Sequence, residues 1–220
     1  MSVAEPVVPF EGGVLSAAWT TCEDPVAQLV LTHGAGAGFQ HSSMVSIAEA
    51  CAKVGIVTLR FNFPFIERGA SRVDAKPVAM HAIREAVALA RHTGEALPLF
   101  LGGHSFGGRM ASHAVVELGL DVRGLVFCSF PLHPAKKPSV ARARHLPDIS
   151  VPMLFLSGTR DALADRRLLQ QTVQGLPQAE LHWLETADHS YKILKRTRSN
   201  PLGVFDEMAK VARRFMAPLL

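Results

Sequence analysis

The chain has 220 residues, of which 48% are hydrophobic and 19% are charged, and its formal net charge is +4. This composition excludes a disordered chain, and the length is sufficient for one domain, residues 1–220, with a substantial core. No apolar run approaches the ~18 residues that a membrane span requires, so we expect no membrane partner.

The N-terminal residues include Glu5 and Pro6, where a signal peptide would carry basic residues and an apolar core. The three cysteines are too widely spaced for a paired metal motif or a disulfide framework, which favours a reducing, cytoplasmic location. The basic residues are spread along the chain without aromatic interleaving or a reading motif. A solvated basic face therefore explains them better than a nucleic-acid surface, and no nucleic-acid partner is expected. The sequence leaves the oligomeric state open.

Seven short apolar runs predict strands, and most segments between them have helical spacing. The predicted strands are residues 15–20, 28–32, 56–61, 97–102, 124–128, 152–157 and 180–184. Strands that alternate with helices indicate the α/β class, with a mostly parallel, doubly wound sheet flanked by helices. In such sheets the functional residues lie at the C-terminal ends of the strands.

Helical spacing predicts two apolar helix faces and several helix ends. The faces consist of Val78, Ala82, Ala86 and Leu89, and of Val204, Met208, Val211 and Phe215. Glycines predict helix ends at Gly55, Gly94, Gly119 and Gly175. Residues 131–147 are proline-rich and basic and interrupt the alternation. We interpret them as an excursion over the site that is too short for a large lid domain.

The segment Gly103-His104-Ser105-Phe106-Gly107 lies between the apolar run 97–101 and a predicted helix. A serine on such a tight strand-to-helix turn has a strained backbone, and its hydroxyl stands above the sheet at the positive end of a helix. The flanking glycines allow close approach of the neighbouring chain. The pentapeptide by itself also fits an ordinary turn, but the strand before it and the helix after it favour a nucleophile, Ser105.

A second glycine-rich segment, residues 33–38, follows the predicted strand 28–32. Backbone amides in such a loop can approach a substrate oxygen, so we assign an oxyanion hole to the N–H groups of Ala35 and Phe106. A flexible turn and a dinucleotide-binding loop are the alternatives. The dinucleotide motif requires glycine where Phe39 or His41 stands, and an acidic residue where Arg60 stands, so this alternative fails on spacing.

Two further motifs follow the last two predicted strands. Asp161, after strand 152–157, could accept a hydrogen bond from a histidine and fix its tautomer, or it could cap the next helix. Asp165 is the competing carboxylate, and we expect it inside that helix. His189 follows strand 180–184 and is one of ten histidines, of which His104 only neighbours the nucleophile in sequence. The chain order serine, aspartate, histidine is the order of a hydrolase triad on a doubly wound sheet.

Cys128 ends a predicted strand next to the site but lacks a partner that would activate it, so buried packing is the better interpretation. No His-x-x-x-His or Cys-x-x-Cys spacing occurs in the chain, so no metal site is expected. An acyl-enzyme mechanism needs no organic cofactor, and we expect none.

Together the four motifs resemble the α/β-hydrolase superfamily, and the likeness extends from about residue 15 to the end of the chain. The segments 60–69, 103–109 and 130–134 are also similar to a compact branch of that superfamily. This branch contains small bacterial hydrolases related to the dienelactone hydrolases, and eukaryotic testis-expressed and histone-acetyltransferase-complex regulatory proteins. The serine at position 105, where dienelactone hydrolases have cysteine, argues against a lactone substrate.

The resemblance implies an α/β-hydrolase fold. With the triad of Ser105, Asp161 and His189, we predict a serine hydrolase that cleaves a carboxylic ester or thioester. The short excursion predicts no large lid domain and an open site suited to small acyl groups. Alternatives with the same fold are a peptidase or acyltransferase that uses the same triad, and a non-catalytic interaction protein.

We expect Glu67 to pair with Arg109 or Arg68 and so brace the loop. The functional alternative is that Arg68 contacts the substrate. The other candidate substrate-binding residues are Gly34 and His133.

Overall fold

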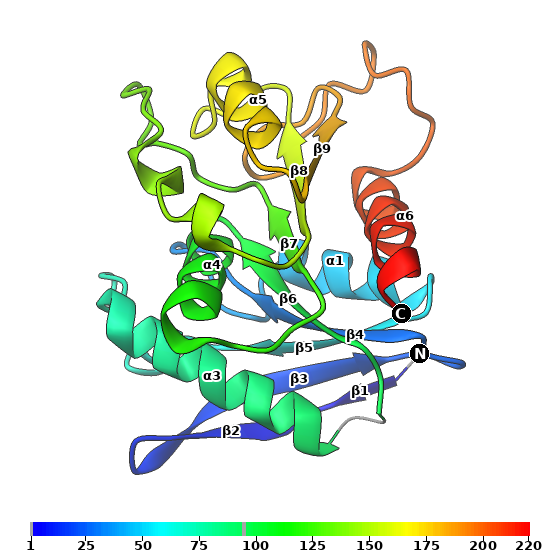
Figure 1. Ribbon diagram of the computed structural model, residues 1–220. Helices are drawn as coiled ribbons and strands as arrows, with labels where there is room; N and C mark the ends of the chain where they lie inside the picture. Colours follow the sequence, from blue (N-terminus) through cyan, green and yellow to red (C-terminus); the bar gives the residue numbers. More distant parts are fainter. Residues whose placement is uncertain (1, 94–95) are drawn as a thin grey trace.

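The computed structural model describes residues 2–93 and 96–220, and its centre is a nine-stranded mixed sheet (Figure 1). The strands lie in the order β1-β3-β5-β4-β6-β7-β8-β9, and β2 pairs with β3 off this path. All pairings from β5 to β9 are parallel, whereas those of β3 are antiparallel. The bounds are β1 Ser2–Ala4, β2 Val7–Phe10, β3 Gly13–Thr21, β4 Ala27–Thr32, β5 Ile56–Phe61, β6 Leu99–His104, β7 Leu125–Cys128, β8 Met153–Gly158 and β9 Ala179–Leu184.

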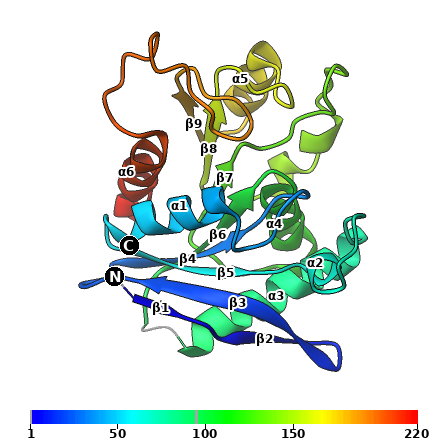
Figure 2. The ribbon, with the colours of Figure 1, turned by 180° about the vertical axis from the view of Figure 1, so that it is seen from behind.

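Helices cover both faces of this sheet, as a doubly wound architecture requires. Helices α1 and α6 pack on one face, and α3, α4 and α5 on the other, as Figures 1 and 2 show from opposite sides. The bounds are α1 Ser42–Ala52, α2 Pro64–Glu67, α3 Lys76–Thr93, α4 Phe106–Leu118, α5 Arg166–Gln174 and α6 Val204–Met216. The predicted fold class, a mostly parallel, doubly wound sheet flanked by helices, is confirmed.

Two separate cores explain why the central strands show no polar alternation. In β7, Leu125 and Phe127 join the core beneath α3, α4 and α5, while Val126 and Cys128 join the core beneath α1 and α6. A strand buried on both faces contacts apolar side chains with every residue, so it reads as one continuous apolar run.

All seven predicted strands are present, with ends displaced by two residues at most. The sequence prediction missed β1 and β2. Both are short, and β2 contains Pro9, which lacks a backbone N–H and usually argues against a strand. Strand β2 tolerates Pro9 because it pairs with β3 alone, at the margin of the sheet.

The apolar face predicted for α6 is buried as expected, whereas the face of α3 is rotated slightly. Val78 and Leu89 are only half-buried, and an alanine stripe takes the centre of the interface. The stripe consists of Ala79, Ala82, Ala86 and Ala90, each 0% exposed. Small side chains at this spacing let the helix axis approach its neighbours closely, and Ile83 and Val87 complete the buried face.

The predicted helix ends agree with the structure only in part. Gly119 is the C-cap of α4 in the left-handed region, with φ 61°. Gly175 also caps a helix, α5, but at φ −81°, where any residue fits. Gly55 has φ 79° and follows the last residue of α1 by three positions. The end predicted at Gly94 lies outside the described residues.

The excursion 131–147 contains two short 3₁₀ turns, Ala141–Ala143 and Leu146–Asp148, and forms no separate domain. It packs along the outer side of α4, where the rings of His113 and His145 stack with centroids 3.7 Å apart. The Nε2–H group of His145 also donates to Ser112 Oγ, at 2.7 Å. The excursion thus packs against the middle of α4 and does not form a lid domain.

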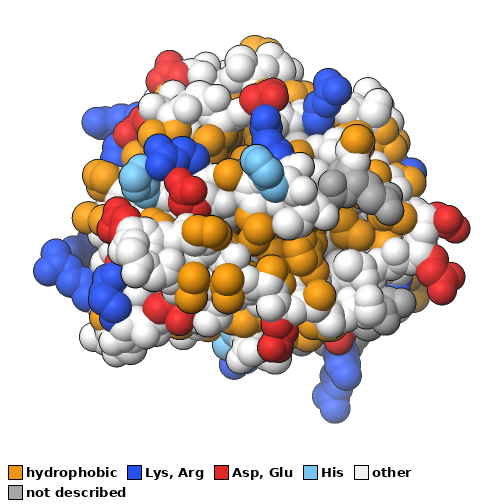
Figure 3. All heavy atoms as spheres, turned by 90° about the horizontal axis from the view of Figure 1, so that it is seen from below, with side chains coloured by type: hydrophobic (Ala, Val, Ile, Leu, Met, Phe, Trp, Pro, Cys, Tyr) orange, Lys and Arg blue, Asp and Glu red, His pale blue; other side chains and the backbone are white. Residues whose placement is uncertain are grey.

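The antiparallel strands leave several large apolar side chains exposed. Val3, Val7 and Val14 are 60%, 50% and 57% exposed. Figure 3 shows the molecule from below, with hydrophobic side chains gathered near the centre of this face and charged ones around them. Across residues 2–93 and 96–220, no helix combines the length and hydropathy of a membrane span.

Candidate active site

Ser105 lies on the turn between β6 and α4 with φ 51° and ψ −115°. This left-handed backbone is strained for a residue with a Cβ. The turn is held from both sides: the Ser105 N–H donates to the Cys128 carbonyl at 3.0 Å, and Gly107 and Gly108 lie against neighbouring backbone. A Cβ on Gly107 would come within 2.5 Å of the His33 carbonyl oxygen, so only glycine fits there.

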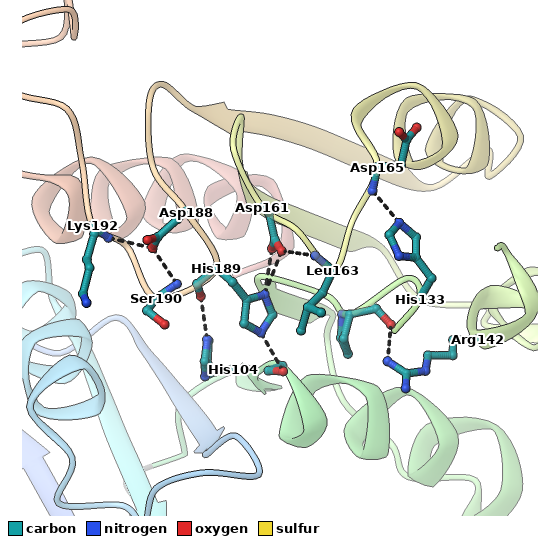
Figure 4. Close-up of polar contacts among 12 residues, drawn as sticks. His104, His133, Arg142, Asp161, Leu163, Asp165, Asp188, His189, Ser190 and Lys192 are labelled. Atoms are coloured by element: carbon teal, nitrogen blue, oxygen red, sulfur yellow. Dashed lines mark hydrogen bonds and ion pairs between the residues drawn. The ribbon is translucent and has the colours of Figure 1, made fainter. Parts of the chain in front are cut away.

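His189 connects Ser105 to Asp161 in a continuous chain of hydrogen bonds (Figure 4). Its Nε2 lies 2.9 Å from Ser105 Oγ, and its Nδ1 lies 2.9 and 2.8 Å from the two oxygens of Asp161. Since a carboxylate only accepts, Nδ1 carries the hydrogen and Nε2 is free to accept the serine proton. The three predicted side chains, from three different strand ends, therefore meet at one edge of the sheet.

The carboxylate of Asp161 has no exposed surface, and Oδ1 also accepts from the Leu163 N–H at 2.8 Å. Asp165, expected inside the next helix, is instead the N-cap of α5, where its side chain accepts from the Leu168 N–H at 3.0 Å. The N-cap residue precedes the helix that it caps, so the position predicted for Asp165 was wrong by one residue. Because Asp165 takes the capping role, Asp161 is available to His189.

His104 is a further part of the site that the sequence prediction set aside. Its Nε2–H donates to the backbone carbonyl of His189 at 3.0 Å, and its ring centroid lies 5.1 Å from that of His189. Burial lowers the pKa of His104 to about 4, so the ring is neutral near pH 7. A histidine next to the nucleophile in sequence gives no hint of a contact 85 residues away.

The loop after β4 is fixed by His33, which is fully buried. Its Nε2 accepts from the Phe63 N–H at 2.9 Å, so Nδ1 carries the hydrogen and donates to the Gly34 carbonyl at 2.7 Å. In a trans peptide the C=O and the following N–H point in opposite directions, so this bond turns the Ala35 N–H away from His33. Burial lowers the pKa of His33 to about 4, which keeps the neutral tautomer.

A pocket of about 270 Å³ opens beside Ser105. Most of its lining comes from the loop after β4, the start of α1 and the loop that carries His189. The lining residues are Gly34, Ala35, Gly36, Ala37, His41, Ser43, Met44, His104, Ser105, His189 and Ser190. Gly34 and Ala35 were predicted at this position. The residues from the start of α1 were not, because no sequence motif indicates which helix closes a pocket.

The pairing predicted for Glu67 is wrong. Arg68 pairs with Asp74, at 2.6 Å, and Glu67 accepts from the Ser16 N–H, at 2.8 Å. Asp74 is buried and also accepts from the Phe65 N–H, so it attracts the nearest cation. Arg109 forms no side-chain hydrogen bond or ion pair within the described ranges, and Arg68 does not line the pocket.

His133 is buried, and both of its ring nitrogens bond within the protein. Nδ1 donates to the Pro134 carbonyl at 2.9 Å, and Nε2 accepts from the Asp165 N–H at 2.8 Å. The ring therefore ties the excursion to the start of α5 and does not line the pocket, in contrast to the substrate contact predicted for it.

Cys128 is fully buried in the core beneath α1 and α6, and burial raises the pKa of its thiol. A thiol that resists ionisation is a poor nucleophile, in agreement with the packing role expected for it. Among the residues that the structure describes, no group of three or more His, Cys, Asp or Glu side chains is arranged to hold a metal ion.

Comparison with known proteins agrees with this architecture. A family model described as an alpha/beta hydrolase domain matches residues 25–217. A lidless α/β serine hydrolase from Xanthomonas campestris superposes with a TM-score of 0.71 at 17% identity, over 99% of this chain and 95% of that one. Dienelactone hydrolase from Anabaena variabilis superposes with a TM-score of 0.75 at 16% identity, over 99% of this chain and 97% of that one. Est1E from Butyrivibrio proteoclasticus, solved with ferulic acid bound, gives 0.73 at 14% identity, over 97% and 98%. At these identities the three structures establish the fold alone.

Proposed function

The chain belongs to the alpha/beta hydrolase family, and on that premise we propose that it is a serine hydrolase that cleaves carboxylic esters or thioesters. The observation that carries the proposal is the position of His189 between Ser105 Oγ and the buried carboxylate of Asp161. A histidine held in one tautomer by a carboxylate can accept the proton of a serine hydroxyl that it contacts.

In the first half of the reaction, Ser105 Oγ attacks the carbonyl carbon of the substrate while His189 Nε2 takes its proton. The negative charge that develops on the carbonyl oxygen is stabilised by the backbone N–H groups of Phe106 and Ala35. Removal of one such donor typically costs about 2.7–4 kcal/mol of transition-state stabilisation. The alcohol or thiol then leaves with the proton from His189, and the acyl group stays on Ser105.

In the second half, a water molecule attacks the acyl-enzyme. His189 takes a proton from that water and returns it to Ser105 Oγ as the carboxylic acid leaves. Asp161 stabilises the imidazolium in both steps because its carboxylate contacts the Nδ1–H group and is shielded from water. The sum is ester plus water to acid plus alcohol, with the enzyme unchanged.

The pocket supports a small substrate. At about 270 Å³ and with alanine, glycine and methionine in its lining, it suits a compact acyl or aryl group. Est1E, which shares the fold, is solved with ferulic acid, a small acid of this type. We therefore propose a small-molecule acyl substrate for this protein as well.

The test is turnover of short-chain aryl esters together with covalent labelling by a fluorophosphonate probe. We expect one labelled site, and loss of both labelling and turnover in Ser105→Ala. A fall of about 10³-fold or more in kcat is typical when a nucleophile is removed.

Ser43 provides a matched control. It lines the same pocket, and its Oγ lies 2.8 Å from His41 Nδ1, but no carboxylate bonds to His41 in the described part of the chain. Ser43→Ala should still label, which would place the reactive hydroxyl at Ser105. Folded protein that neither labels nor turns over any ester would favour a non-catalytic interaction protein. Faster turnover of aminoacyl amides than of esters would indicate a peptidase.

A further inference from the structure

Arg109 is a half-buried cation without a counter-ion. Its Nε is inaccessible to solvent and has no hydrogen-bond partner, and no carboxylate pairs with its guanidinium within residues 2–93 and 96–220. Glu117, eight residues after Arg109 on α4, is already bonded through both carboxylate oxygens to Lys76. A half-buried guanidinium without a counter-ion can bind a group of opposite charge, because such a pair offsets the cost of its partial desolvation.

The Nε atoms of Arg60 and Arg198 also lack a partner, but other guanidinium nitrogens of both residues are bonded within the protein. Arg60 donates to the Phe39 carbonyl and to Thr20 Oγ1, at 2.8 and 3.1 Å. Arg198 pairs with Glu207. Arg109 differs from them because no nitrogen of its guanidinium bonds to another group in the described part of the chain.

The position of Arg109 relates it to the nucleophile. Ser105 precedes α4, and Arg109 follows it by four residues, about 6 Å along the helix axis. A long helical side chain leans toward the N-terminus, over the preceding turn. The preceding turn is the one that begins at Ser105.

Arg142 approaches the same end of α4 from the excursion, as Figure 4 shows. Its only protein hydrogen bond within the described ranges is a long one, 3.5 Å, to the Pro131 carbonyl. Burial lowers the pKa of Arg109, and the nearby charge of Arg142 adds to that shift. The neighbouring His113 and His145 also have lowered pKa values, chiefly through burial, so they add no positive charge near pH 7.

We propose that Arg109 and Arg142 together bind a carboxylate carried by the substrate, so that the hydrolase acts on anionic esters. This proposal rests on the serine hydrolase function above. Two guanidinium groups on one side of Ser105 would hold the anionic end of a substrate whose ester carbonyl lies over the serine, while the apolar pocket on the loop side takes an uncharged end.

The experiment compares each anionic ester with its methyl-capped neutral counterpart. For an anion on the acyl side, the pair is 4-nitrophenyl hydrogen adipate and 4-nitrophenyl methyl adipate. For an anion on the alcohol side, it is 4-acetoxybenzoate and methyl 4-acetoxybenzoate. The measured quantity is the ratio of kcat/KM, anionic over neutral, after subtraction of spontaneous hydrolysis. We expect a ratio of at least about tenfold in one pair, falling as ionic strength rises.

Arg142→Ala and Arg109→Ala should each bring the ratio toward one, and Arg142→Lys should keep part of it. Arg144→Ala is the matched control, because it removes an exposed arginine of the same excursion and should leave the ratio as it was. A ratio near one in both pairs for the natural chain would overturn the proposal, as would a ratio that survives the Arg109→Ala/Arg142→Ala double variant. Turnover of neutral esters in that case would still support the serine hydrolase, whereas no turnover of any ester would reject the hydrolase itself.

Discussion

The backbone strain at Ser105 is sustained by residues with no side chain. Gly102, Gly103, Gly107 and Gly108 all lie so close to neighbouring strands or loops that a Cβ would overlap backbone atoms. Close packing of this kind holds the left-handed turn in place, because the turn cannot relax without moving β4, β6 or β7. The hydroxyl is thereby held in front of His189 before any substrate binds.

Gly107→Ala tests this account of the turn. The new methyl group would lie 2.5 Å from the His33 carbonyl oxygen, and overpacking of that kind typically costs about 1–3 kcal/mol. We expect a lower free energy of unfolding in urea and weaker labelling of Ser105. Gly175→Ala is the matched control, because its nearest contact would be an ordinary 3.5 Å and its φ of −81° suits alanine. Equal stability of the two variants would contradict the account.

Some residues of the site could be predicted from the sequence, and others could not. Ser105, Asp161 and His189 could be placed because each follows a predicted strand, and parallel strands end at one edge. Ion-pair partners could not be placed. Arg68 pairs with Asp74, and Glu67 accepts a hydrogen bond from a backbone amide. Which partners pair depends on burial and on distances in three dimensions.

At the scale of elements, the segment between β9 and α6 carries His189 and is anchored from its far side. Arg198, in this segment, pairs with Glu207 of α6, and His182 of β9 donates to Glu207 Oε1 at 2.8 Å. The side chains of Arg198 and Glu207 are 3% and 7% exposed. This buried network ties the segment to the last helix and the last strand together.

Removal of Glu207 should therefore be costly. Glu207→Ala leaves Arg198 buried without a counter-ion, and breaking a buried pair in this way costs about 3–5 kcal/mol. Urea denaturation measures the loss. Asp206→Ala is the matched control on the same helix: its partner Lys53 is 67% exposed, and a surface pair contributes about 1 kcal/mol or less. Comparable losses in the two variants would show that the Glu207 network is not the anchor.

Elements with a strong pattern could be predicted, and those without one could not. The apolar runs from β4 to β8 were visible because both of their faces are buried. Strands β1 and β2 have three and four residues with much exposed surface, so their pairing depends on β3 and not on their own pattern. The predicted face of α3 was displaced because apolar residues also occur at Ile83 and Val87, so the spacing fits more than one face of the helix.

At the scale of the whole molecule, neutral buried histidines link stability to pH. Burial lowers the pKa values of His33, His104 and His145 to about 4, against an ordinary value of 6.5. Between these two values the unfolded chain binds protons that the folded chain does not, so acid favours unfolding in this window. Their contribution to the free energy of unfolding is complete above about pH 6.5 and is lost progressively as the pH falls toward 4.

We therefore expect the free energy of unfolding to decline from pH 6.5 to pH 4.5. His33, which is fully buried, contributes up to about 1.4 kcal/mol per pH unit, and His104 and His145 act in the same direction. Urea titrations at several pH values, with proton uptake measured on unfolding, test this expectation. A free energy of unfolding that stays constant from pH 6.5 to pH 4.5, without uptake of protons, would contradict the conclusion that these histidines are neutral in the folded protein.

The order of the site along the chain has a consequence for biosynthesis. Ser105 is translated 84 residues before His189, which at ordinary elongation rates is a delay of roughly 4 to 17 s. Throughout that interval the nascent polypeptide carries Ser105 without His189, the base proposed for it. Helix α6, which anchors the histidine segment, emerges later still. On the proposed mechanism the site is complete only after residue 189 has been added, and a translation product truncated before that position would lack the proposed base.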